Sequence, residues 1–105
     1  MEPTNNQARL WTRQAILETL AQHRAVLQGM GVRRIGLFGS YVRDTATQDS
    51  DIDFLVDLGK PSFDGYMELK IYLEDLFGRK ADLILEQNIK PPLRPRILEE
   101  VVYAA

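Results

Sequence analysis

Two aspartates separated by one residue, Asp51 and Asp53, are the residues of this sequence best suited to metal chemistry. They open a run of alternating apolar residues, which predicts a β-strand from which both carboxylates project on one face, about 6.5–7 Å apart. Two carboxylates at that spacing can hold a hard cation such as Mg²⁺. An ionised carboxylate facing a covered sheet is also costly without a partner, and a divalent metal would be one. The pair therefore predicts a metal site.

A glycine and a serine, Gly39 and Ser40, precede this pair, with ten residues between Ser40 and Asp51. They follow a short apolar run, and a glycine at a strand end with a serine opening a helical turn leaves backbone N–H groups available to a phosphate. Gly39 allows close approach of an oxyanion, and the Ser40 hydroxyl adds a donor. Phosphate donors beside metal-binding carboxylates predict a Mg²⁺–nucleotide site.

A third carboxylate, Asp82, opens a later apolar run, much as Asp51 opens its own. If the two strands are neighbours, Asp82 can reach a second metal ion or accept the proton of an attacking hydroxyl. Glu86 lies on the same face, about 13 Å further along, and is the weaker candidate. An Asp-x-Asp motif without the other residues more often marks a solvated strand end. The combined glycine, serine and aspartate pattern, however, arises by chance in roughly one sequence of this length in a thousand.

Two other motifs and a histidine site are excluded. An EF-hand loop beginning at Asp49 would need glycine where Phe54 stands. The glycines at 36 and 39 are not followed by the Lys-Ser/Thr of a Walker loop. His23, the single histidine, has no histidine or cysteine partner in a metal or nucleophile motif, so we expect a partly exposed helix residue.

The elements that must position these residues alternate between helix and strand. Apolar patterning predicts helices over 12–30 and 63–77 and strands over 34–38, 51–58 and 81–86. A last helix is expected over 93–103, after the prolines. A short helical turn over 40–44, with Ser40 near its N-cap, follows the first strand. Gly78 ends the second long helix, and the three prolines of 88–96 predict a linker. The order predicts a small α/β or α+β sheet covered by helices, with Tyr66 packed in the core.

Length and composition limit the possible functions. A chain of 105 residues is long enough for one domain and too short for an additional substrate domain. It lacks the apolar run of about 20 residues that a membrane span needs, and residues 1–6 do not resemble a signal peptide. With no cysteine and a net charge of −2, thiolate sites and nucleic-acid binding are both disfavoured. We expect a cytoplasmic protein.

The segment Leu37-Phe38-Gly39-Ser40, then Arg43, and then the run 49–56 resemble the minimal nucleotidyltransferase (MNT-type) family of the DNA polymerase β-like superfamily. The similarity extends to residues 94–101. It implies a polymerase β-like fold with a small mixed β-sheet in a single domain, 1–105. It also implies a triphosphate held by Gly39 and Ser40, and two Mg²⁺ ions held by Asp51, Asp53 and Asp82.

Two further positions are compared with the family pattern. Arg43 would contact phosphates or an acidic partner surface, and an exposed structural arginine is an equal alternative. Asp44 stands where many relatives carry glycine, and aspartate tolerates the left-handed backbone better than most residues.

The resemblance further implies a reaction and a partner. AMP would move from ATP to a hydroxyl, most readily a tyrosine of a HEPN ribonuclease toxin, and the chain would be the antitoxin of that toxin. One alternative is a non-catalytic nucleotide-binding module that neutralises its partner by occlusion, although a pure binder has no use for three converging acids. Another is transfer to a small molecule, although larger relatives of that kind use an added domain to hold the acceptor. The short chain favours a macromolecular acceptor.

Overall fold

The computed structural model describes residues 11–104, and in it a four-stranded mixed sheet forms the centre of the molecule. The strand order is β3-β2-β1-β4. Strand β2 pairs antiparallel with β1 and parallel with β3, while β4 pairs antiparallel with β1. The strands are β1 (Val32–Phe38), β2 (Ile52–Leu58), β3 (Ala81–Leu85) and β4 (Val102–Tyr103). The predicted α/β class with a small mixed sheet is confirmed.

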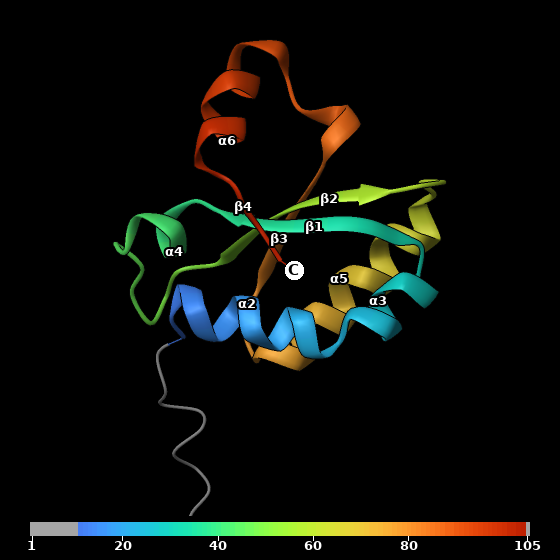
Figure 1. The fold of residues 1–105 in the computed structure, drawn as a ribbon, viewed down its shortest axis with the longest axis horizontal. Coiled ribbons are helices and arrows are strands. Elements are labelled where there is room, and N and C mark those ends of the chain that lie inside the picture. Colours follow the sequence, from blue (N-terminus) through green and yellow to red (C-terminus); the bar gives the residue numbers. More distant parts are fainter. Residues whose placement is uncertain (1–10, 105) are drawn as a thin grey trace, which may run out of the picture.

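Helices lie on both faces of this sheet (Figure 1). One face carries α2 (Arg13–Gln22), α3 (Arg24–Gly29) and α5 (Phe63–Phe77). The other carries α6 (Arg94–Glu100), which follows the 3₁₀ turns η1 (Glu86–Asn88) and η2 (Pro91–Leu93). The four-residue helix α4 (Ser40–Arg43) continues directly from β1. Within residues 11–104, no helix has both the length and the apolar character needed to cross a membrane.

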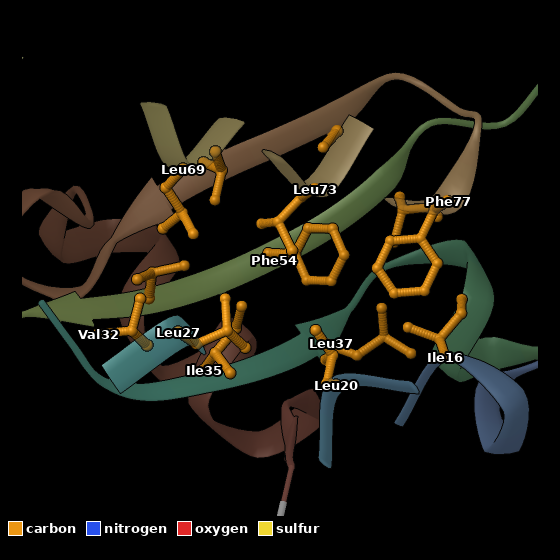
Figure 2. Packing of buried hydrophobic residues seen from close by; sticks show 14 of the residues in the cluster. Ile16, Leu20, Leu27, Val32, Ile35, Leu37, Phe54, Leu69, Leu73 and Phe77 are labelled. Atoms are coloured by element: carbon orange, nitrogen blue, oxygen red, sulfur yellow. The ribbon is translucent and has the colours of Figure 1, made fainter. Parts of the chain in front are cut away.

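The larger core lies between the sheet and the helices α2, α3 and α5. Phe54 is fully buried there, and Figure 2 shows Leu73 and Phe77 of α5 pointing toward it. The rings of Phe54 and Phe77 are 5.8 Å apart. A smaller core on the opposite face contains Phe38, Leu55, Ile89 and Ile97. Both faces of the central strand are therefore covered next to Asp53.

Helix α5 has the predicted bounds. Its N-cap, Ser62, accepts a hydrogen bond from the Gly65 N–H at 3.0 Å, and Gly78 ends it in the left-handed conformation at φ 65°. Tyr66 packs against the main core, as predicted, and donates its hydroxyl to the Leu83 carbonyl at 3.0 Å.

The single helix predicted over 12–30 is wrong in one respect, because the chain forms two helices, α2 and α3, with a break at His23. The backbone of His23 leaves the helical region, with φ −102° and ψ 16°. Neither His23 nor its neighbours are helix breakers, so propensity gives no signal. The break coincides with a tertiary contact, a 2.6 Å hydrogen bond between His23 Nδ1 and the Tyr72 hydroxyl.

The helix predicted over 93–103 is also wrong at its end. Helix α6 stops at Glu100, and β4 pairs with Gly36 and Leu37 of β1. A β-carbon on Gly36 would lie 2.6 Å from Val101 Cγ2, so the glycine leaves room for the chain to cross β1. The run of two valines and a tyrosine at 101–103 has high strand propensity, and its pairing with β1 makes use of it.

Smaller differences concern boundaries. Strand β1 begins at Val32 instead of residue 34, and β3 ends at Leu85 instead of residue 86. Ser40 is the first residue of α4, and Gly39 occupies the N-cap position predicted for it. Residues 1–6, which we examined for a signal peptide, lie outside the described residues.

Candidate functional site

Strand register brings two of the three predicted aspartates together. Asp53 of β2 is aligned with Asp82 of β3 and, on its other side, with Phe38 of β1. Adjacent strands are about 4.8 Å apart, so the two carboxylates belong to one row across the sheet. This row lies on the face that α6 covers further along, since Leu55 packs on Ile97. The predicted neighbourhood of the two strands is confirmed.

Gly39 follows Phe38 and meets Asp53 directly. Its backbone, at φ 81° and ψ −151°, is one that side-chain-bearing residues rarely adopt. The position a β-carbon would take is filled by the Asp53 carboxylate, whose Cγ would be 3.0 Å away. We expected this glycine to let the backbone approach a phosphate oxyanion. In the structure the Asp53 carboxylate itself occupies the space beside this backbone. Residue 39 must therefore be a glycine even when no ligand is bound.

The remaining predicted phosphate-binding residues lie on α4. Ser40 is partly exposed, and its hydroxyl has no hydrogen-bond partner within the described part of the chain. Arg43, in the last turn, is exposed and donates to a carboxylate of α6. Asp44 ends the helix at φ 63° and ψ 34°, so it does adopt the left-handed conformation that glycine would favour. Ser40 is therefore open to a ligand, and Arg43 is already paired.

Burial and the neighbouring acids disfavour the ionisation of Asp53. Burial, followed by the charges of Asp82 and Asp51, raises the pKa of Asp53 to about 6. The charge of Arg43 acts in the opposite direction but does not offset them. Asp51 and Asp82 are exposed, whereas Asp53 is half-buried. The site thus concentrates negative charge around one partly desolvated carboxylate.

This charge distribution suits a hard divalent cation, because the donors are oxygens and a cation would relieve the repulsion between them. Among residues 11–104, however, no three carboxylate or imidazole side chains are arranged so that they could hold a metal ion. Asp51 and Asp82 are exposed, so their side chains have room to change rotamer toward an ion shared with Asp53. The three acids fit a Mg²⁺ site in chemistry and charge.

Two residues of α5 fix the start of β3, immediately before Asp82. Lys70 donates to the Ala81 carbonyl, and Glu74 accepts from the Ala81 N–H at 2.9 Å. That backbone hydrogen bond, followed by the one from Lys70, lowers the pKa of Glu74. Both polar groups of Ala81 are therefore satisfied by α5, which holds the backbone that carries Asp82.

Glu86, the weaker candidate, lies away from the aspartates. Its carboxylate accepts two hydrogen bonds from Arg34, at 2.7 and 3.0 Å, and one from the Tyr103 hydroxyl at 3.3 Å. The hydrogen bond with Arg34 lowers the pKa of Glu86 although burial opposes this. These contacts join β1, β4 and the end of β3. Glu86 therefore stabilises the sheet.

Sequence reasoning missed Glu100, the last residue of α6. Its carboxylate accepts the Gly39 N–H at 2.8 Å and Arg43 Nη1 at 2.6 Å. Burial opposes its ionisation, but these two hydrogen bonds outweigh burial and lower the pKa of Glu100. No motif identified it, because its partners lie about sixty residues away and only the fold brings them together.

A groove of about 650 Å³ lies further along β3 than the aspartate row, toward the end of the strand. It lies between the start of α5, strand β3 and the segment leading into α6, and its lining includes Phe63, Ile84 and Leu93. Ile84 follows Asp82 by two residues on the same face of β3, so this end of the groove is about 7 Å from Asp82. Phe63 and Leu93 are 78% and 49% exposed. An apolar groove therefore begins two residues beyond Asp82 on β3.

Comparison with known proteins identifies the family. The model of the nucleotidyltransferase domain family matches residues 16–104. The protein adenylyltransferase MntA of Thermococcus cleftensis is 44% identical over 94 residues, which cover 88% of this chain and 95% of that protein. A candidate protein adenylyltransferase of Methanocaldococcus jannaschii is 41% identical, with 84% and 93% covered.

Solved structures share the fold. A minimal nucleotidyltransferase with 34% identity superposes with a TM-score of 0.69, covering 82% of this chain and 93% of that one. A toxin–antitoxin structure containing AMP-PNP has 21% identity and a TM-score of 0.70, with 85% and 72% covered. A complex of a tri-AMPylated HEPN toxin with its MNT antitoxin from Shewanella oneidensis has 19% identity and a TM-score of 0.62, with 84% and 70% covered. The chain belongs to the nucleotidyltransferase domain family and is a nucleotidyltransferase.

Proposed function

We propose that this nucleotidyltransferase moves AMP from ATP to a tyrosine hydroxyl of a HEPN-domain toxin and thereby acts as its antitoxin. The most similar relatives described above are named as protein adenylyltransferases. A protein of the same fold is the MNT antitoxin in a complex with an AMPylated HEPN toxin. The observation that carries the proposal is the row formed by Asp53 and Asp82, with Gly39 packed against it.

In the proposed reaction, the acceptor oxygen forms a bond to the α-phosphorus of ATP while the bond to the pyrophosphate oxygen breaks. Asp51, Asp53 and Asp82 would hold two Mg²⁺ ions, which supply positive charge at the attacking and leaving oxygens. A tyrosine hydroxyl has a pKa of about 10, so it must lose its proton to a base near neutral pH. Asp82, exposed at the edge strand, is the residue we assign to accept that proton.

The leaving group is the pyrophosphate formed by the β- and γ-phosphates. We assign its binding to the Ser40 hydroxyl, which is free to donate, and to the turn that Gly39 begins. Arg43 lies at the other end of α4, where its guanidinium can contact a phosphate while it remains paired with Glu100. All three residues come from one short segment that leaves β1 beside Asp53.

We assign the acceptor protein to the apolar groove beside Asp82. A segment lying along Ile84 would bring a hydroxyl to the aspartate row. Its rim offers Phe63 and Leu93, which are large apolar side chains left exposed to solvent. These features favour a macromolecular acceptor over a small molecule.

The proposal is tested by incubating the protein with ATP, Mg²⁺ and the HEPN-domain protein encoded beside it, and by recording intact masses. We expect AMP adducts on the partner with the wild type and none with Asp53→Asn. Asp57→Asn is the matched control, because Asp57 lies on the same face of β2 and its nearest cation, Arg33, is 3.9 Å away. This control should retain the wild-type rate.

Other outcomes would decide against the proposal. Undiminished transfer by Asp53→Asn would refute the assigned role of the aspartates. No adduct at all, together with stoichiometric inhibition of the partner, would favour a non-catalytic module that acts by occlusion.

A further inference from the structure

Glu100 connects the C-terminal helix to the two ends of α4. One carboxylate oxygen accepts the N–H of Gly39, the N-cap of α4, and the other accepts Nη1 of Arg43 in its last turn. The side chain of Glu100 is 18% exposed, whereas that of Arg43 is 49% exposed. A single carboxylate therefore bridges the segment to which the proposed function assigns the phosphates.

The bond to Gly39 makes this contact more than a surface ion pair. An exposed ion pair contributes little, because solvent screens it and the side chains lose freedom. Gly39, however, is buried, and an unpaired buried N–H is unfavourable. Its backbone is also fixed against the Asp53 carboxylate. Glu100 thus holds the residue whose position decides where Asp53 can lie.

Glu100 itself is held by the strand that follows it. Val101 donates its N–H to the Ile97 carbonyl at 2.9 Å and turns the chain into β4. Strand β4 pairs with Gly36 and Leu37 of β1. Leu37 lies only two residues before Gly39 in the chain. The donor and the acceptor of the Glu100–Gly39 bond are therefore anchored to the same strand. A carboxylate held this way is suited to fix a turn and poorly suited to swing out of it.

We propose that Glu100 is a positioning residue of the nucleotidyl-transfer site, which fixes the Gly39–Ser40 turn and orients Arg43 toward the phosphates. The inference rests on the proposed function for its kinetic consequences. The opposing possibility is that Glu100 occupies the place of a phosphate and competes with ATP. The partial exposure of Ser40 and the pairing of β4 with β1 directly after Glu100 favour the positioning role.

The test uses Glu100→Gln, with Glu99→Gln as the matched control, because Glu99 is the exposed preceding residue of the same helix. The amide of glutamine presents N–H groups to either Gly39 or Arg43, so one of the two hydrogen bonds must be lost. We expect kcat/KM for ATP to fall about 10- to 100-fold, as for other small misplacements in active sites. The amide resonance of Gly39 should move, and the control should change neither quantity.

A second variant tests the coupling to Arg43. Arg43→Gln should reduce kcat/KM, and the double variant with Glu100→Gln should lose little more than either single variant, since both act through one contact. If the loss of kcat/KM in the double variant equals the product of the losses in the two single variants, the coupling between Glu100 and Arg43 is overturned. A lower melting temperature with unchanged kcat/KM would show that Glu100 is merely structural. Tighter binding of AMP-PNP by Glu100→Gln would show that it competes with nucleotide.

The inference and the proposed function can fail separately. A wild-type protein that transfers no AMP to any partner would end the proposed function. The Gly39 amide resonance and the affinity for AMP-PNP would still report on Glu100 in that case. An unmoved Gly39 resonance in Glu100→Gln would overturn the inference even if AMP transfer were confirmed.

Discussion

Asp53 is a half-buried acid whose nearest charged neighbours include two further acids, and this arrangement has a measurable consequence in the absence of metal. Its pKa of about 6 lies above the ordinary value of 3.8, with burial as the main cause. The folded protein therefore binds a proton at Asp53 that the unfolded chain has already lost at pH 5. The stability contributed by this protonated group decreases as pH rises from about 4 to about 6.

Asp53→Asn should consequently stabilise the metal-free protein at pH 7. We expect an increase of about 1–3 kcal/mol in the free energy of unfolding, because the neutral amide avoids the cost of ionising Asp53 in the fold. The increase should disappear near pH 4, where Asp53 of the wild type is largely protonated. Urea unfolding in EDTA from pH 4 to 7 measures both effects. Adding Mg²⁺ at pH 7 should stabilise the wild type more than the variant, and equal stabilisation would count against metal binding at Asp53.

Gly39→Ala tests the contact between the turn and the aspartate. The backbone of Gly39 has φ 81°, and a β-carbon would meet the Asp53 carboxylate. We expect a loss of about 1–3 kcal/mol in stability together with loss of AMP transfer. Gly29→Ala is the control, since no atom lies within 4 Å of its β-carbon position at the end of α3. It should be neutral or slightly stabilising. A Gly39→Ala protein as stable as this control would contradict the packing described.

At the residue scale, the sequence predicted the residues that have a local pattern. Asp51 and Asp53 alternate with apolar residues, and Gly39–Ser40 follow an apolar run, so spacing alone marks them as candidates for the site. Their alignment with Asp82 depends on the order of the strands in the sheet, which local spacing does not determine. Glu100 could not be found, because an acid near a helix end has no distinguishing neighbours. Its role depends on a contact between residues about sixty positions apart.

At the element scale, α5 and β2 were predictable and the C-terminal segment was not. The apolar residues of α5 follow helical spacing between a serine N-cap and a glycine, and those of β2 alternate with polar residues except at Leu55. Residues 101–103 instead offered helical spacing and strand propensity together. Pairing with β1 decided between them, and that pairing requires the missing side chain of Gly36.

Gly36→Ala should therefore loosen β4 and, through it, the helix end that carries Glu100. The new β-carbon would lie 2.6 Å from Val101 Cγ2, so β4 must move. We expect a loss of about 1–3 kcal/mol in stability and faster hydrogen exchange at Ala104, whose N–H donates to the Ile35 carbonyl at 2.9 Å. AMP transfer should fall with it. Unchanged protection of Ala104 would mean that β4 accommodates the methyl group.

At the scale of the whole molecule, the question is where the proposed acceptor protein would bind. The aspartate row lies on a sheet whose two faces are otherwise covered by helices, and an open groove lined mainly by apolar side chains lies further along β3. The groove wall at β3 is not a free strand edge, because Tyr66 and Lys70 already donate to the carbonyls of Leu83 and Ala81. The proposed partner would therefore bind by placing its side chains in the groove and not by adding a strand to the sheet.

Phe63→Glu tests whether the partner uses this groove. Phe63 is 78% exposed and begins α5, where an acid suits the helix dipole, so the variant should fold normally. Burying a glutamate in an apolar contact is unfavourable, so we expect binding to the proposed HEPN-domain partner to weaken about tenfold or more. Affinity for AMP-PNP should stay unchanged, because Phe63 lies outside the aspartate row and α4.

Ile71→Glu is the matched control for Phe63→Glu, since Ile71 is an exposed apolar residue of the same helix, 54% exposed, that does not line the groove. Partner affinity measured by calorimetry should separate the two variants, with the Ile71→Glu protein resembling the wild type. If both variants bind the partner as tightly as the wild type, the acceptor reaches Asp82 from another direction. If both weaken binding equally, the interface follows the exposed side of α5 and the groove has no special part in it.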